Sequence, residues 1–132
     1  MNLKQEADKF MEKKGTSLTF DAYQKEAKKT AIYPKSAGVM YPALGLTGEA
    51  GEVANKVKKI VRDGQENSPP DWREQISHEL GDVLWYCAAL ASDLGLSLGR
   101  IAKENANKLS GRKQRGTLGL SLIHISEPTR PY

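Results

Sequence analysis

The chain has a single cysteine, Cys87, among its 132 residues, so no disulfide can form within it. It also lacks any apolar run near the roughly 20 residues that a membrane-spanning helix needs. The opening stretch Met1–Glu6 is too polar and too acidic for a secretory signal peptide. Together these absences predict a cytoplasmic protein that has no membrane partner.

Aromatic residues are also few, at 7% of the chain, and no long run alternates apolar with polar residues. Strands are therefore poorly supported, whereas the abundant alanine, leucine, lysine and glutamate favour helices. The length suits one small domain with a core of its own. We accordingly expect an all-α fold, a helical bundle of about four to five helices with short connections.

The formal net charge of +4 is compatible with an anionic ligand, including nucleic acid. However, the lysines are spread along the expected helices and are not gathered in one block, and few aromatic residues lie between them. This distribution argues against nucleic acid as the main partner.

Helical periodicity and helix-ending residues predict five helices, with expected ranges of 1–14, 20–32, 44–62, 72–94 and 97–110. Thr19 is the expected N-cap of the second helix. Asp71 is the expected N-cap of the fourth, although Ser68 could serve instead. Pro42 is expected in a loop before the third helix.

Three segments differ in character. Residues 1–15 form an N-terminal helical extension, residues 16–119 form one domain, and residues 120–132 continue no helical pattern. The last segment resembles the translated read-through of a transposase adapter from sequencing-library preparation, so we expect that the natural C-terminus was lost there. A natural disordered tail is the alternative. This segment is left out of the functional interpretation.

Two pairs of carboxylates occur at i, i+3 spacing, Glu49 with Glu52 and Glu79 with Asp82. On a helix, both members of a pair leave the same face one turn apart. At about 100° per residue, Glu79 falls inside the apolar arc of its helix, with Asp82 to one side. Glu49 likewise falls among apolar residues, with Glu52 on the flank. Acids on a core-facing stripe are typical of a bound cation.

If the two helices pack together, the four carboxylates converge, and two such charges ~5 Å apart repel by about 3 kcal/mol at an effective dielectric near 20. The acids could take up protons, pair with basic side chains or bind divalent cations. An all-carboxylate site favours Mg²⁺, with Mn²⁺ possible, over zinc or iron. His78 has no second histidine four residues later, and neither pair supplies the Glu-x-x-His of a di-iron bundle.

Simpler interpretations remain open for these residues. The acids could be solvated, or could form salt bridges along one helix, such as Glu52 with Lys56 at i, i+4. Lys56 and Lys59 follow the first acidic pair by one to two turns on a similar side. They could contact the outer phosphates of a metal-bound ligand, or be ordinary surface lysines.

Over about residues 20–119 the chain resembles the small, single-domain MazG-type nucleoside triphosphate pyrophosphohydrolases of phages and bacteria. The segments that carry this resemblance are 44–53 (LGLTGEAGEV), 79–86 (ELGDVLWY) and 105–109 (NANKL), followed by Arg112. The resemblance implies a MazG-like all-α domain that assembles as a homodimer or a higher homo-oligomer. It also implies Mg²⁺-dependent hydrolysis of NTPs or dNTPs to the nucleoside monophosphate and pyrophosphate.

The resemblance further implies roles for individual residues. The metal would be held by Glu49, Glu52, Glu79 and Asp82. Either Glu49 or Glu52 would act as the catalytic base that orients the attacking water, and the sequence does not choose between them. The nucleotide would be bound by Asn105 and Lys108, with Arg112 at a basic position near the phosphates. Lys56 and Lys59 are candidates for phosphate contacts from their helical position alone. Similar proteins continue into a glycine-rich, basic C-terminus, whereas this chain has Gly116–Gly119 and then the foreign-looking tail.

Three aromatic residues, Tyr23, Trp85 and Tyr86, are candidates to stack on the base, with core or interface packing as the favoured alternative. Two other functions are alternatives: a non-catalytic helical adaptor that binds a basic partner, and a nucleic-acid-binding bundle. Gly48, Gly51 and Gly81 beside the acids argue against an adaptor. Glycine costs up to about 1 kcal/mol inside a helix, so its use there suggests close approach of backbone or ligand.

Overall fold

A computed structural model of the chain describes Gln5 and residues 17–116. The helix expected over residues 1–14, apart from Gln5, and the segment 120–132 lie outside this part of the chain. The described part contains helices and no strands, which confirms the all-α fold. Its elements are α2 (Phe20–Lys29), η1 (Lys35–Ala37), α3 (Met40–Asp63), η2 (Gln65–Asn67), α4 (Trp72–Asp93) and α5 (Leu98–Gln114).

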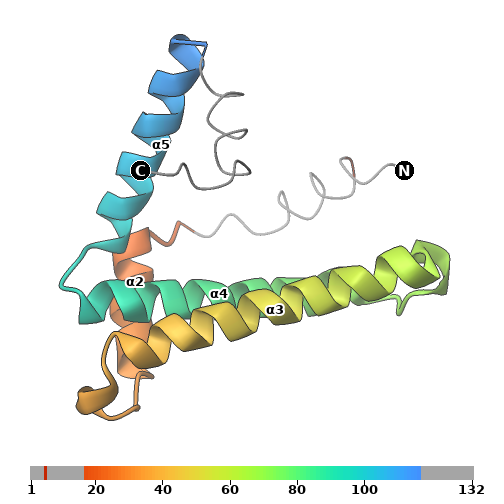
Figure 1. The fold of residues 1–132 in the computed structure, drawn as a ribbon, viewed down its shortest axis with the longest axis horizontal. Coiled ribbons are helices and arrows are strands. Elements are labelled where there is room, and N and C mark those ends of the chain that lie inside the picture. Colours follow the sequence, from red (N-terminus) through yellow and green to blue (C-terminus); the bar gives the residue numbers. More distant parts are fainter. Residues whose placement is uncertain (1–4, 6–16, 117–132) are drawn as a thin grey trace, which may run out of the picture.

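The two long helices, α3 and α4, lie side by side in opposite directions and form a hairpin that is closed by η2 (Figure 1). The short helix α2 crosses one end of this hairpin and contacts α4 and α5. From the same end, α5 rises away from the hairpin (Figure 1). Within the described residues, no helix is long and apolar enough to cross a bilayer.

The starts of α2 and α4 lie where the sequence signals predict them. Thr19 caps α2 as predicted, because its Oγ1 accepts a hydrogen bond from the backbone N–H of Ala22 at 3.0 Å. Asp71 stands at the N-cap position of α4, but its backbone is not in the extended conformation of a usual N-cap. Its carboxylate therefore accepts from the Gln75 side chain at 2.9 Å instead of from a backbone N–H.

Three predicted helix limits were wrong. α3 begins at Met40 and not at residue 44, because Pro42 is tolerated in a first turn, where its missing N–H has no intrahelical partner. α2 ends at Lys29 and not at residue 32, with the Thr30 hydroxyl donating to the Ala27 carbonyl at 2.9 Å. α5 continues to Gln114 and not to residue 110. Gly111 follows directly after residue 110, but a glycine inside a helix costs only about 1 kcal/mol, so α5 continues through it.

The buried core is small and lies where α2, α4 and α5 meet. Its centre is formed by Ala27, Ala88 and Leu98, and the partly buried side chains packed against it are Tyr23, Trp85 and Cys87. Cys87 is thus a small side chain packed against the core, and burial raises the pKa of its thiol. Tyr23 and Trp85 belong to this core, in agreement with the favoured alternative for them.

A strained turn precedes α3. Val39 has φ 66° and ψ −55°, and the Met40 N–H donates to the Gly38 carbonyl at 2.8 Å, which together define a tight γ-turn. The Asp93 carboxylate of α4 holds this turn: its Oδ2 accepts from the Val39 N–H at 3.1 Å and from the Tyr33 hydroxyl at 2.7 Å. The start of the acid-bearing helix is therefore tied to the end of its hairpin partner.

Candidate metal centre

Three of the four predicted acids converge between the two hairpin helices. Glu49 of α3 and Glu79 and Asp82 of α4 each offer a carboxylate oxygen, and these oxygens all lie within 4.8 Å of one another. Glu49 and Glu79 are partly buried, and Asp82 is exposed. We call these three residues the acidic cluster.

The cluster forms because each helix carries an acid on the stripe that it packs against the other. Glu79 is partly buried, and so are apolar residues on the same face of α4, which include Trp72, Ile76, Val83 and Tyr86. On α3, Glu49 is partly buried together with Leu46, Val53 and Ile60. Helical periodicity was therefore sufficient to place both glutamates on the helix–helix interface.

Glu52 is not a member of the acidic cluster. It is exposed on the flank of α3, as its helical position predicts, although its negative charge contributes to the raised pKa of Glu49. The main cause of that raised pKa is partial burial, followed by the charge of Asp82 and the contact with Glu79. In the metal-free protein the cluster thus carries negative charge that its surroundings do not fully balance.

Lys56 is the basic residue nearest to the cluster. Its Nζ lies 3.4 Å from Oε1 of Glu79, so the ion pair that it forms runs across the hairpin to α4. The alternative ion pair of Lys56 with Glu52 along α3 is not the one that forms. Beyond Lys56, a cavity of about 300 Å³ opens near the η2 end of the hairpin. It is lined by Lys56, Lys59, Ile60, Asp63, Ser68, Pro69, Trp72 and Gln75.

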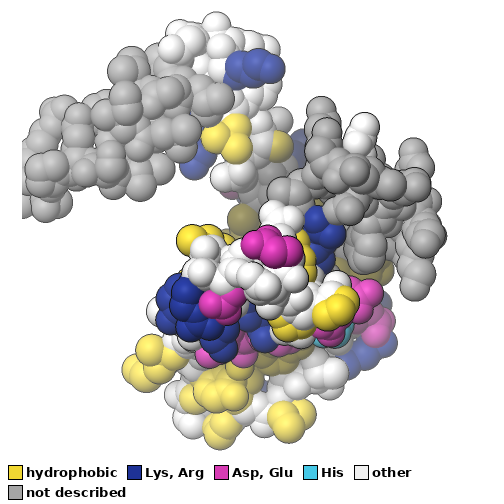
Figure 2. Space-filling model, turned by 90° about the vertical axis from the view of Figure 1, so that its right-hand side faces the viewer, with side chains coloured by type: hydrophobic (Ala, Val, Ile, Leu, Met, Phe, Trp, Pro, Cys, Tyr) yellow, Lys and Arg dark blue, Asp and Glu magenta, His cyan; other side chains and the backbone are white. Residues whose placement is uncertain are grey.

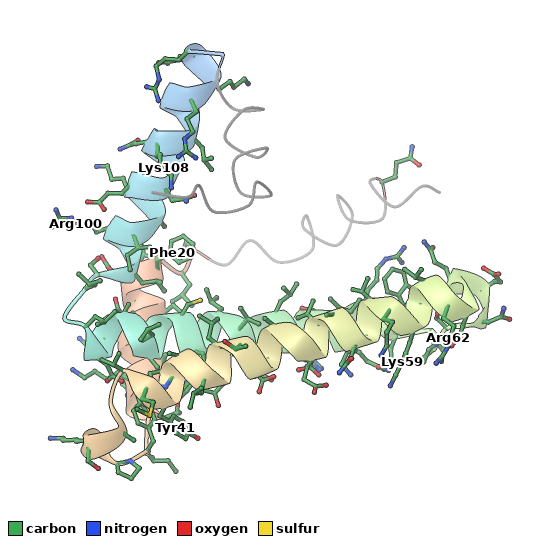
Figure 3. The ribbon with its side chains drawn as sticks, in the orientation of Figure 1. Phe20, Tyr41, Lys59, Arg62, Arg100 and Lys108 are labelled. Carbon is green, nitrogen blue, oxygen red and sulfur yellow. The ribbon has the colours of Figure 1, made fainter. Side chains whose placement is uncertain are left out.

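The nucleotide-binding candidates on α5 stand apart from the acids. Asn105 and Lys108 are exposed, and Arg112 is partly buried. Figure 3 shows Lys108 on the part of α5 that rises from one end of the hairpin, whereas Lys59 lies toward the other end. One chain therefore does not bring the two sets of predicted substrate-binding residues together.

The glycines beside the acids are not sites of close backbone approach. A Cβ added at Gly48, Gly51 or Gly81 would meet no atom within 4 Å, so close approach of another backbone was wrong, and close approach of a ligand stays a prediction. Among the glycines of α3 and α4, the crowded one is Gly45, where a Cβ would overlap the ring of Tyr86. The sequence held a signal that was missed, since Gly45 lies four residues before Glu49 and hence on the same helix face.

Tyr86 connects the acidic cluster to a row of aromatic rings. Its ring centroid lies 6.4 Å from that of Tyr41, which stacks on Tyr33 at 4.6 Å. Partial burial raises the pKa of Tyr86, with further contributions from Tyr41 and from the charges of Glu49 and Asp82. The overlap with Gly45 places the Tyr86 ring one turn before Glu49 along α3, on the side of the cluster away from Lys56 and its cavity.

The donor set of the acidic cluster fits a hard divalent cation. All three ligands are carboxylates, which Mg²⁺ and Mn²⁺ prefer, and the raised pKa of Glu49 reports the unbalanced charge that a cation neutralises. His78, which precedes Glu79, is exposed and is not part of the cluster. The cluster therefore offers oxygen ligands that could hold a hard divalent cation.

Comparison with known proteins adds to this geometry. The family model described as the MazG nucleotide pyrophosphohydrolase domain matches residues 42–117, which is more than half of the chain and contains the whole acidic cluster. The Gene 37 protein of Mycobacterium phage L5 is 46% identical over 104 residues, covering 74% of this chain and 91% of that protein. No solved structure matches.

Proposed function

Because the chain belongs to the MazG nucleotide pyrophosphohydrolase family, we propose that it hydrolyses NTPs or dNTPs to the nucleoside monophosphate and pyrophosphate with Mg²⁺. The observation that supports this most is the convergence of Glu49, Glu79 and Asp82 inside the matched segment. The proposed substrates are cytoplasmic metabolites, in keeping with the location expected from the single cysteine.

The acidic cluster would hold the metal, with Mn²⁺ as the alternative to Mg²⁺. When bound, the cation offsets the negative charge of the triphosphate and of the carboxylates. Glu49 and Glu79 supply ligands from the helix–helix interface, where their positions are set by packing. Asp82 supplies an exposed ligand on the solvent side.

Glu52 is the best candidate to orient the attacking water. It lies one turn from Glu49 on α3, outside the acidic cluster, and its exposure leaves the carboxylate open to solvent. From there it could accept the proton of a water that attacks the α-phosphorus, and pyrophosphate would leave. Glu49 is the alternative base, and partial burial and the neighbouring acids raise its pKa.

Basic residues on two sides would stabilise the negative charge of the phosphates. Lys56 and Lys59 line the cavity next to the cluster. Asn105, Lys108 and Arg112 lie on α5, which rises away from the hairpin at the end opposite to η2 (Figure 1). We therefore place them in the site of a second copy, which requires a homodimer or a higher homo-oligomer.

Exposed apolar side chains support such an assembly. Each hairpin helix carries a pair at i, i+4 spacing, Val57 (42% exposed) with Val61 (81%) and Leu80 (54%) with Leu84 (36%). Figure 2, which views the hairpin from its η2 end, shows hydrophobic side chains at the surface among charged ones. Exposed large apolar side chains on two neighbouring helices are consistent with a surface that binds another protein.

Release of pyrophosphate from a panel of NTPs and dNTPs tests the proposal. We expect turnover with Mg²⁺, loss of turnover with a chelator, and recovery when Mg²⁺ is restored. Release of orthophosphate would contradict attack at the α-phosphorus. Salt-dependent binding of duplex DNA without any turnover would instead favour the nucleic-acid-binding alternative. Binding of a basic protein without turnover would favour the adaptor.

A further inference from the structure

One ion pair of the described residues differs from the others. Lys56 and Glu79 join the two helices of the hairpin, and their side chains are only 31% and 18% exposed. Three other pairs of described residues join positions within four of each other, and their side chains are at least 41% exposed: Glu26–Lys29, Arg62–Asp63 and Arg100–Glu104. Exposed pairs of that kind contribute little, whereas a shielded pair between helices has a larger effect.

The same Glu79 carboxylate has two possible partners. Oε1 of Glu79 lies 3.4 Å from the Lys56 ammonium, and a Glu79 oxygen is also one of the three that converge in the acidic cluster. A divalent cation held by the cluster would lie close to the ammonium, and like charges in a partly shielded site repel strongly. The cation and the ammonium therefore compete for Glu79.

We propose that Lys56 is an internal counter-ion of the metal centre, which neutralises Glu79 in the metal-free protein and is displaced when the cation binds. This inference rests on the proposed metal site but not on hydrolysis. It gives Lys56 two opposite effects: the lysine stabilises the hairpin without metal, and it weakens the affinity of the cluster for metal.

The displaced ammonium has a place to go. Lys56 also lines the cavity of about 300 Å³ that contains Lys59 and Trp72. Rotation of the flexible lysine stem away from Glu79 brings the ammonium into this cavity, beside a second positive charge. Metal loading thereby raises the positive potential of the cavity, which then favours an anionic group of the ligand.

Binding of Mn²⁺ to the substrate-free protein tests this directly, because free Mn²⁺ is measured by electron paramagnetic resonance. We expect Lys56→Met to bind Mn²⁺ on the order of tenfold more tightly than the wild type, since one competing charge is gone. Lys58→Met is the matched control, as it removes the same charge from an exposed position on the same helix, where Lys58 contacts only Asn55 at 3.5 Å. Screening by salt should limit its effect to less than about twofold.

Lys56→Arg restores the positive charge and should return the Mn²⁺ affinity to within about threefold of the wild type. Equal affinities for Lys56→Met and Lys58→Met would overturn the proposal. So would weaker binding by Lys56→Met, which would make Lys56 a support of the metal site. If neither the wild type nor Lys56→Met binds Mn²⁺, the proposal is also wrong.

Thermal unfolding in the presence of a chelator gives a second, metal-independent measurement. Lys56→Met should lower the unfolding midpoint by several degrees more than Lys58→Met, because it leaves Glu79 shielded and without its partner. Adding Glu79→Gln to Lys56→Met should recover most of that loss. Equal midpoints for the two single lysine variants would contradict the counter-ion role.

The two proposals fail separately. If the Mn²⁺ and midpoint effects occur but no pyrophosphate is released, the counter-ion role is supported and the proposed reaction is contradicted. If pyrophosphate is released but neither effect occurs, the reaction is supported and the counter-ion role is contradicted.

Discussion

The ring of Tyr86 on α4 lies directly against the backbone of Gly45 on α3, where a Cβ would overlap the ring. This contact sets the distance between the two helices one turn from Glu49, and it holds Tyr86 next to the acidic cluster. The separation of the hairpin helices near the acidic cluster thus depends on residue 45 being a glycine.

Gly45→Ala should destabilise the protein by about 1–3 kcal/mol, because the added methyl must displace the ring or the helix. Gly48→Ala is the matched control on the same helix. Its Cβ would meet open space, so it should stabilise α3 by up to about 1 kcal/mol. Urea unfolding followed by circular dichroism measures both. Similar changes in the free energy of unfolding for the two variants would show that Tyr86 does not constrain Gly45.

Glu79→Gln and Asp82→Asn should each lower pyrophosphate release by about 100-fold or more while the helical content is unchanged, since each removes a charged ligand and keeps the shape. Glu74→Gln, an exposed acid on the same helix, is the control and should keep activity within about twofold. Full activity in either cluster variant would remove that residue from the site.

The metal-free protein should become more stable relative to Glu49→Gln as the pH falls. The folded protein raises the pKa of Glu49 above its usual value of 4.5, so the ionised carboxylate opposes folding at neutral pH. That penalty is fully present above the raised pKa and is relieved as the pH falls through it. In a chelator, Glu49→Gln should therefore unfold at a higher temperature than the wild type at pH 7, and the difference should shrink toward the usual pKa. A difference that does not change with pH would contradict the raised pKa.

Tyr33 should ionise late because of its bond to Asp93. Partial burial, the hydrogen bond to Asp93 and the charge of Asp93 raise the pKa of Tyr33 to about 12. The stabilising effect of protonated Tyr33, which donates to Asp93, is fully present below the usual pKa of 10.0 and is lost as the pH rises toward 12. From the usual pKa of 10.0 up to nearly 12, the wild type and Tyr33→Phe should therefore show nearly the same gain in tyrosinate absorbance.

Asp93→Asn supplies the contrasting result in that titration. Loss of the negative charge should lower the pKa of Tyr33 toward its usual value, so the variant should show one additional tyrosinate at moderately alkaline pH. It should also be less stable than the wild type, because the neutral amide oxygen of asparagine accepts more weakly than a carboxylate from the Tyr33 hydroxyl and from the Val39 N–H. Identical titration curves for wild type and Asp93→Asn would mean that Asp93 does not control Tyr33.

Two inactive variants should restore activity to each other if α5 serves the site of a partner copy. In a co-expressed mixture of Glu79→Gln and Lys108→Ala, half of the dimers are mixed, and each mixed dimer has one intact site, so activity should reach about a quarter of wild type. Lys103→Ala, an exposed lysine on the same helix, is the control and should be active alone. A mixture that stays inactive would place Lys108 and the acids in the same chain.

Some features followed from the sequence because they are local. The 3.6-residue period located the four described helices, and the Thr19 hydroxyl was placed by its position just before an apolar run. The same period put Glu49 and Glu79 on half-buried stripes and Glu52 on a flank, since the face that a residue occupies depends only on its number along the helix.

Other features were decided only by tertiary structure. Lys56 has acids within reach on two helices, and its pairing with Glu79 across the hairpin depends on how α3 and α4 are aligned along their lengths. The overlap at Gly45 depends on the same alignment, and the separation of Lys108 from the acidic cluster depends on the direction in which α5 leaves the hairpin. Helix alignment and direction arise from many weak side-chain contacts between elements, and no spacing within one element contains that information.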